Sequence, residues 1–128
     1  MDAAPAGLPA LSRSQELGRL AAKSGFDWAS APDVVYKVRE ELGELEQAVG
    51  SGDTTAVDEE LGDLLFTISM LARKLSIDGE GALGRANVKF DRRFRWIEAE
   101  LNRRGESLDG TDSDALERLW ALAKTQSD

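Results

Sequence analysis

Apolar residues recur every three or four positions along most of this chain, and this spacing limits the fold more than any other feature. The longest such stripe consists of Leu83, Ala86, Phe90, Phe94, Ile97 and Leu101. Steps of three and four follow the turn of an α-helix, so these side chains share one face. No segment shows the strong alternation of apolar and polar residues that is typical of a half-buried β-strand. The sequence therefore predicts an all-α fold.

Capping and helix-breaking residues divide the chain into four main helices and a short C-terminal helix. Residues 30–33 resemble a capping box with Pro near the first helical position, and residues 50–52 end the helix that follows. Thr54 or Thr55 is expected to cap the third helix, and residues 78–81 to separate it from the fourth. The predicted helices cover residues 11–24, 31–49, 54–75, 82–104 and 112–124. We expect them to form a helical bundle.

The length of 128 residues suits one domain with a hydrophobic core. We expect a flexible tail over residues 1–9, a single helical domain over residues 10–124 and a frayed C-terminus over residues 125–128. The third predicted helix contains the run LGDLLFTISMLA, which is apolar around most of its circumference and so favours burial on several sides. Because the chain is short, we expect oligomerisation to complete the bundle, as a homodimer or a higher homo-oligomer.

The net charge of -8 argues against a protein that binds nucleic acid or an anionic membrane by electrostatic attraction. Nowhere do 18 apolar residues follow one another, and the first residues lack a basic segment followed by a long apolar one. We therefore expect a soluble, cytoplasmic protein with neither nucleic acid nor a membrane as its partner.

The chain has neither Cys nor His, and this absence limits its chemistry. It excludes disulfides, thiolate nucleophiles and the catalytic Ser-His and Cys-His pairs. It also disfavours the Glu-x-x-His sites of di-iron helical bundles. A metal ion would therefore be bound by oxygen atoms, which suits Mg²⁺, Mn²⁺ or Ca²⁺.

Three acids on the second predicted helix, Glu40, Glu41 and Glu44, form an E-E-x-x-E motif. At about 100° per residue they share an arc of roughly 100°, so their carboxylates can converge on one point. The opposite side of the helix carries apolar residues such as Val38 and Leu42. Taken alone, the motif is explained more often by a solvent-exposed acidic face than by a binding site.

A second acidic motif, E-E-x-x-D, lies on the third predicted helix and consists of Glu59, Glu60 and Asp63. Helical geometry places Glu60 at the edge of the apolar stripe that contains Leu64 and Leu71. An ionised carboxylate among such neighbours costs several kcal/mol unless a cation or hydrogen-bond donors compensate. Lys and Arg side chains are one source of compensation, but two facing clusters favour a metal ion. Mg²⁺ fits, because it binds carboxylates while keeping water and phosphate ligands.

Lys89, Arg92 and Arg93 place positive charge on the fourth predicted helix. In isolation, a solvated flank explains them equally well. Opposite a metal cluster they match the needs of a polyphosphate, because the metal binds some of its oxygens and Lys or Arg binds the others. Lys37 lies one turn before Glu41 and fits either this role or a simple ion pair with that residue.

Three segments in this order resemble a known family. The chain contains KVREELGELEQA, then DEELGDLLFTISMLAR, then ANVKFDRRF, with a GFDW segment ahead of them. Together these segments resemble the MazG-type all-α nucleoside triphosphate pyrophosphohydrolases over residues 8–104. The resemblance implies Mg²⁺-dependent hydrolysis between the α- and β-phosphates, with nucleoside monophosphate and pyrophosphate as products and Mn²⁺ as an alternative metal.

The same resemblance implies roles for individual residues. The positions that match the family's metal ligands are Glu41, Glu44, Glu60 and Asp63. Glu40 matches an additional acid that holds a further metal or orients the attacking water. The positions that match substrate-binding residues are Lys37, Lys89, Arg93 and Trp120, with Trp120 near the base. Because Trp120 also shares helical spacing with Leu116 and Leu119, a place in the core is the commoner role for such a residue.

Two alternative functions remain open on the sequence. One is a narrow-specificity member of the same superfamily that acts on dUTP, dCTP or phosphoribosyl-ATP. The other is a non-catalytic helical dimer with a regulatory or scaffolding role. In that case the acidic clusters would only form ion pairs with Lys37, Arg73, Arg92 and Arg93. The loop between the acidic motifs is short, and longer family members carry two such domains, of which this chain matches the catalytic C-terminal one.

Overall fold

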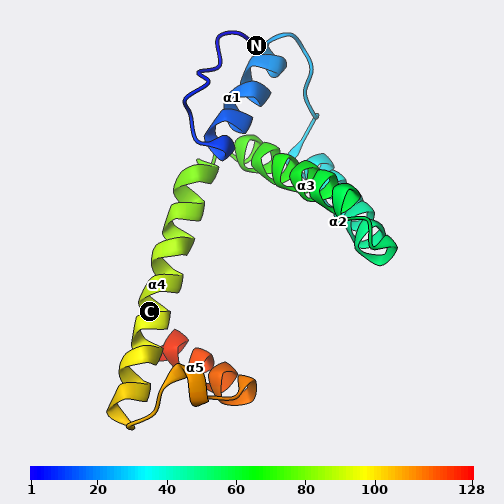
Figure 1. The fold of residues 1–128 in the computed structure, drawn as a ribbon. Helices are drawn as coiled ribbons and strands as arrows, with labels where there is room; N and C mark the ends of the chain where they lie inside the picture. Colours follow the sequence, from blue (N-terminus) through cyan, green and yellow to red (C-terminus); the bar gives the residue numbers. More distant parts are fainter. The chain divides into compact units, whose positions relative to one another are not determined.

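The computed structural model describes residues 1–128, and every regular element in it is helical (Figure 1). The five α-helices are α1 (Ala10–Lys23), α2 (Ala31–Ser51), α3 (Thr54–Lys74), α4 (Gly79–Arg103) and α5 (Ser113–Gln126), and a 3₁₀ turn, η1 (Leu108–Gly110), precedes the last. No strand is present, so the predicted all-α class with four main helices and a shorter C-terminal one is confirmed. None of the helices is long and apolar enough to cross a membrane.

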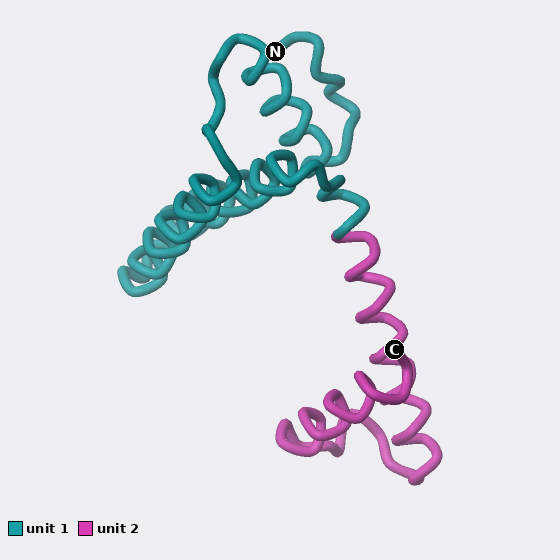
Figure 2. Tube along the Cα trace, turned by 180° about the vertical axis from the view of Figure 1, so that it is seen from behind, with its two compact units in different colours: residues 1–82 teal, residues 83–128 magenta.

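The chain groups into two compact units, an N-terminal unit of residues 1–82 and a C-terminal unit of residues 83–128 (Figure 2). The N-terminal unit contains α1, α2, α3 and the first turn of α4. The C-terminal unit contains the rest of α4 together with η1 and α5. Each unit has its own packing and is described by itself.

Helices α2 and α3 form an antiparallel hairpin in the N-terminal unit (Figure 1). The N-cap residue of α2 is Ser30, whose Oγ accepts a hydrogen bond from the backbone N–H of Asp33, as the capping box predicts. The helix ends at Ser51, and its C-cap residue is Gly52, where a φ of 74° places the backbone in the left-handed region that glycine adopts without strain. Only Gly52 and Asp53 separate the two helices, so they are forced to lie side by side.

The cap of α3 differs from the prediction. Asp53, and not Thr54 or Thr55, is the N-cap residue, and its Oδ1 accepts hydrogen bonds from the N–H groups of Thr55 at 3.1 Å and Ala56 at 3.3 Å. A carboxylate at this position also interacts favourably with the positive end of the helix dipole, an advantage that a threonine hydroxyl lacks. The helix therefore starts at Thr54.

Helix α1 packs against α3 through small and buried residues. Gly18 is buried, and a Cβ at this position would collide with the side chain of Met70, which is itself only 1% exposed. Glycine at residue 18 therefore lets the two helices approach closely without a shift of the Met70 side chain. This contact fixes α1 to the C-terminal half of α3.

Gln15 ties α1 to the start of α4 and explains why α4 begins earlier than predicted. Its Nε2 donates to the carbonyl of Ile77 at 2.9 Å, and its Oε1 accepts from the N–H of Gly79 at 3.0 Å. An N–H in the first turn of a helix has no partner inside the helix, so this side chain satisfies a group that would otherwise be unpaired. α4 consequently starts at Gly79, whereas the glycines predicted a break as far as residue 81.

The C-terminal unit has a small core between α4 and α5. Ile97 and Leu101 of α4 pack with Leu119 and Ala123 of α5, and all four are at most 3% exposed. The predicted apolar stripe of α4 is therefore buried in its second half only. Its first half remains exposed, since Phe90 is 58% exposed.

A large apolar surface of the hairpin is not covered by the chain itself. α3 buries Thr67, Ser69 and Met70, as expected for a helix that packs on more than one side. The apolar residues of the hairpin that remain exposed include Leu42, Leu61, Leu65, Phe66 and Ile68, at 40–52%. Burial of α3 on several sides, which the sequence predicts, is thus only partly achieved within one chain.

Candidate functional site

A cluster of three carboxylates lies on the hairpin of the N-terminal unit. Glu41 comes from α2, and Glu60 and Asp63 come from α3. Each offers one carboxylate oxygen, and these three oxygens all lie within 4.8 Å of one another. Because Glu60 and Asp63 are three residues apart on one helix, both point to the same side and meet the acid of the facing helix. Three of the four predicted metal-ligand positions are therefore adjacent.

The carboxylate cluster is short of hydrogen-bond donors. Glu41 is 7% exposed, and its Oε2 is buried without a hydrogen-bond partner. Glu60 Oε2 is also buried without a partner. A buried carboxylate oxygen without a donor or cation costs free energy of folding, and a cation within the cluster removes that cost. Oxygen donors alone, brought together by two rigid helices, fit a hard divalent cation such as Mg²⁺.

Lys37 is the one basic residue that contacts the acids of the first motif. Its Nζ lies 3.2 Å from Glu41 Oε1 and 3.3 Å from Glu40 Oε2. The carboxylates of Glu41 and Glu40 raise the pKa of the Lys37 ammonium, so this group is fully charged near neutral pH. Lys37 thus neutralises the outer oxygen of Glu41 and leaves the inner one, Oε2, without a partner.

The remaining acids of the two motifs lie outside the cluster. Glu40 is exposed and pairs with Lys37. Glu44 and Glu59 are exposed and form no ion pair. The structure therefore gathers Glu41, Glu60 and Asp63 and leaves Glu44 as a fourth acid one turn further along α2.

The predicted phosphate-binding arginines lie in the C-terminal unit and are already paired with an acid that sequence reasoning missed. Asp128 accepts hydrogen bonds from the guanidinium groups of both Arg92 and Arg93. Arg93 is the more buried of the two, with its side chain 13% exposed against 47% for Arg92. Lys89 is exposed and forms no ion pair. No sequence motif marks Asp128, which lies in the segment that was expected to fray.

Trp120 of α5 lies beside Arg93. The Arg93 guanidinium carbon is 5.5 Å from the centroid of the Trp120 ring, within the range of a cation–π interaction. The ring of Phe90 is 5.4 Å from that of Trp120 and 6.0 Å from that of Phe94. The sequence left open whether Trp120 contacts substrate or lies in the core, and the structure places it at the edge of the core, half-buried and next to a cation.

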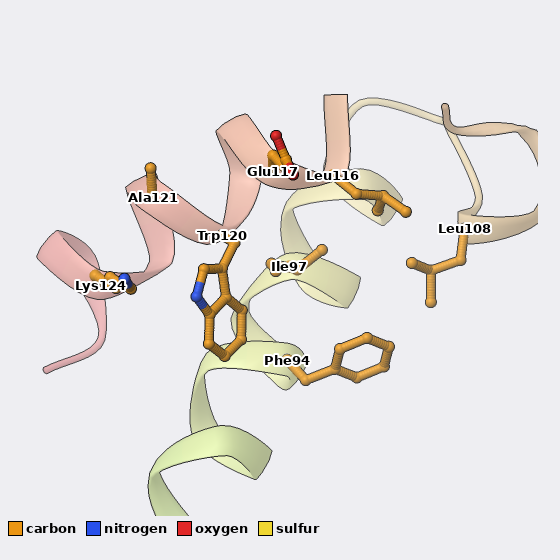
Figure 3. A pocket seen from close by; sticks show the side chains of 8 residues that line it. All are labelled: Phe94, Ile97, Leu108, Leu116, Glu117, Trp120, Ala121 and Lys124. Atoms are coloured by element: carbon orange, nitrogen blue, oxygen red, sulfur yellow. The ribbon is translucent and has the colours of Figure 1, made fainter. Parts of the chain in front are cut away.

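An open cavity of about 530 Å³ adjoins Trp120 (Figure 3). Phe94 and Ile97 of α4 and the ring of Trp120 line one part of it, and Leu108 and Leu116 line another. The polar side chains at its border are Glu117 and Lys124. Its size and its apolar, aromatic lining suit a flat organic ring of the size of a nucleobase.

The other arginine expected to pair with the acidic clusters does not do so. Arg73 and Lys74, at the end of α3, instead pair with Asp27 of the GFDW segment. The guanidinium of Arg73, with the ammonium of Lys74, lowers the pKa of Asp27 to about 2. Of the four basic residues that a purely ion-paired scaffold requires, only Lys37 contacts an acid of either cluster.

The fold and the carboxylate cluster define a class of all-helical proteins that can hold a hard cation between the two helices of a hairpin. Residues 32–97, about half of the chain, match the MazG nucleotide pyrophosphohydrolase domain. The chain belongs to this family.

Similar proteins agree with that assignment. A nucleoside triphosphate pyrophosphohydrolase of Escherichia coli (strain K12) is 41% identical over 128 residues, which cover 98% of this chain and 49% of that protein. The nucleoside triphosphate pyrophosphohydrolase/pyrophosphatase MazG of Thermotoga maritima is 38% identical over 117 residues, which cover 91% of this chain and 45% of that protein. The chain thus spans about half the length of these relatives.

Proposed function

We propose that this protein hydrolyses nucleoside triphosphates and deoxynucleoside triphosphates to the monophosphate and pyrophosphate, with Mg²⁺ as its cofactor and Mn²⁺ as a substitute. The observation that carries the proposal is the cluster of Glu41, Glu60 and Asp63, which has two buried carboxylate oxygens without partners. The names of the similar proteins agree with this reaction. A nucleotide substrate is made and used in the cytoplasm, and we expect the protein to act there.

Glu41, Glu60 and Asp63 would hold the metal, with Glu44 as a further ligand from the next turn of α2. A bound Mg²⁺ supplies a Lewis acid that polarises a phosphoryl oxygen and lowers the pKa of a water molecule. Lys37 fixes one oxygen of Glu41, Oε1, at 3.2 Å and so restricts the orientation of this carboxylate.

The other predicted residues act on water and substrate. Glu40, exposed beside Lys37, orients the attacking water. The oxygen of this water forms a bond to the α-phosphorus as the bond from that phosphorus to the oxygen bridging to the β-phosphate breaks. A proton of the water passes to a carboxylate of the site, and pyrophosphate leaves. Lys89, Arg92 and Arg93 bind phosphate oxygens and stabilise the charge that develops on the leaving pyrophosphate. The Trp120 ring and its neighbouring cavity accept the base.

We further infer that the chain forms a homodimer or a higher homo-oligomer. The support is the uncovered apolar surface of α2 and α3, which includes Leu65 at 52% exposed and Phe66 at 40% exposed. Contiguous apolar surface on a hairpin is typical of an interface between subunits. The single domain expected over residues 10–124 would then be completed by a second copy.

The geometry of the site bears differently on the two alternative functions. A narrow-specificity hydrolase for dUTP, dCTP or phosphoribosyl-ATP would use the same carboxylates and differ only in its base pocket. A non-catalytic scaffold is disfavoured, because Arg73 pairs with Asp27 and Arg92 and Arg93 pair with Asp128, so three of its four bases are engaged elsewhere.

Product analysis tests the proposal. Purified protein is incubated with Mg²⁺ and each NTP and dNTP, beside the Asp63→Asn and Glu60→Gln variants. The matched control is Glu59→Gln, which changes an exposed acid next to the cluster. Monophosphate and pyrophosphate are expected from the wild type and the control only. Diphosphate and phosphate as products would overturn the cleavage site, and turnover of dUTP or dCTP alone would favour the narrow-specificity alternative.

A further inference from the structure

Asp128 binds the arginines in the way that a phosphate group would. Its Oδ1 accepts a hydrogen bond from Arg93 Nε at 2.9 Å and another from Arg92 at 3.3 Å, and its Oδ2 accepts one from the Arg93 terminal nitrogen. The carboxylate therefore occupies the fork of the Arg93 guanidinium with both of its oxygens. Two parallel N–H···O bonds of this kind are also the usual geometry of an arginine bound to phosphate.

This ion pair is partly shielded from solvent on the side of Arg93. The side chain of Arg93 is 13% exposed and that of Asp128 is 31% exposed, and the Trp120 ring lies against the guanidinium of Arg93. The guanidinium groups of Arg93 and Arg92 lower the pKa of Asp128 to about 2, and Asp128 in turn raises the pKa of Arg93. Both partners are therefore fully charged near neutral pH, and partial burial limits the screening of their attraction by salt.

The backbone that carries Asp128 is held by the fold. α5 continues to Gln126, and the N–H and the Oγ of Ser127 both donate to the carbonyl of Ala123. Ala123 is fully buried against the core formed with α4. Because the carboxylate is tethered within one turn of a packed helix, its effective concentration at Arg93 is far higher than that of a free acid in solution.

We propose that Asp128 is an internal competitor that occupies the phosphate-binding face of Arg92 and Arg93 until a polyphosphate displaces it. The role of these arginines in binding substrate rests on the proposed function. A carboxylate has one charge and two oxygens, whereas a triphosphate has several of each, so the polyphosphate displaces Asp128 while weaker anions do not. Return of Asp128 to Arg93 likewise favours release of pyrophosphate after the reaction.

Binding of inorganic tripolyphosphate in metal-free buffer tests this inference without relying on turnover. Titration calorimetry compares the full-length wild type with Asp128→Asn. The matched control is Asp114→Asn, which makes the same change on an exposed residue of α5 that forms no ion pair. We expect Asp128→Asn to bind tripolyphosphate about three- to tenfold more tightly, because one charge-assisted contact no longer has to be broken. The control should match the wild type.

The same comparison in an Arg93→Gln background identifies the site. The gain in affinity from Asp128→Asn should disappear there, since the displaced partner is missing. Equal affinity of wild type and Asp128→Asn, or no binding by either, would overturn the inference. Turnover of nucleotides is assayed separately, so tighter tripolyphosphate binding without any hydrolysis would contradict the proposed function and leave the internal competitor intact.

Discussion

The ammonium of Lys37 lies 3.2 Å from one oxygen of Glu41, while the other oxygen of Glu41 is buried without a hydrogen-bond partner. The two oxygens of this carboxylate therefore lie in different environments. One oxygen, Oε1, is held by a base on the same helix, and the other, Oε2, has no partner, while the carboxylate as a whole lies beside Glu60 and Asp63. Loss of the contact with Lys37 should therefore change the stability of the protein by different amounts with and without a bound cation.

Replacement of Lys37 by methionine should destabilise the metal-free protein, because Glu41 then loses its only counter-charge while remaining buried. Mg²⁺ should restore most of this loss, since a cation at the cluster compensates the same carboxylate. Urea unfolding in EDTA and in Mg²⁺ measures both effects. Arg39→Met is the control, as Arg39 is exposed on the same helix and forms no ion pair. An equal loss of stability in Lys37→Met and Arg39→Met would contradict the assigned role of Lys37.

Mg²⁺ and Mn²⁺ should raise the melting temperature of the wild type, because an ion that binds only the folded state stabilises it by about 2.7 kcal/mol at a hundredfold excess over its Kd. Glu60→Gln should abolish this shift, since it removes a charge from the cluster. Glu59→Gln, one residue away and exposed, should retain it. Thermal denaturation with increasing metal concentration makes the comparison, and a shift that survives in Glu60→Gln would place the cation elsewhere.

Asp27 should stabilise the fold in a pH-dependent way. Arg73 and Lys74 lower its pKa from the ordinary 3.8 to about 2, so the folded protein binds a proton here less readily than the unfolded chain. The stabilisation is fully present above the unfolded pKa and is lost as the pH falls through about 2. The Asp27→Asn variant should therefore be less stable than the wild type near neutral pH. At a pH near 2 the two proteins should be nearly equal in stability.

Denaturant unfolding at a series of pH values measures the stability difference between wild type and Asp27→Asn. Asp58→Asn serves as its control, because Asp58 is exposed and forms no ion pair. A constant difference between wild type and Asp27→Asn across the acid range would show that the carboxylate acts through packing and not through its charge.

How far the sequence predicts this structure depends on the range of the interactions. The helices of the hairpin and the pairing of Glu60 with Asp63 follow from local spacing, which helical geometry fixes. The early start of α4 at Gly79 could not be predicted, because its partner Gln15 lies 64 residues away. Arg93 and Asp128 are also far apart in the sequence, by 35 residues, and no local pattern indicates that they would form a contact.

Two glycines of similar sequence context should respond in opposite ways to alanine. Gly84 lies inside α4, and a Cβ there would meet no atom within 4 Å, so Gly84→Ala should stabilise the protein by about 0.5–1 kcal/mol through the lower entropy of the unfolded chain. Gly18 lies inside α1 against Met70, and its Cβ would also come within 3.0 Å of Arg73 Nε. Gly18→Ala should therefore destabilise the protein by about 1–3 kcal/mol, the usual cost of overpacking.

Urea unfolding of Gly18→Ala and Gly84→Ala under one set of conditions checks both signs at once. The same substitution is made in each case, so the difference in helix propensity cancels and only the surroundings of the added methyl group remain. Because Met70 is a flexible side chain, a smaller loss at Gly18 would mean that it moves aside and α1 keeps its place. Stabilisation by Gly18→Ala equal to that by Gly84→Ala would contradict the close packing of α1 on α3.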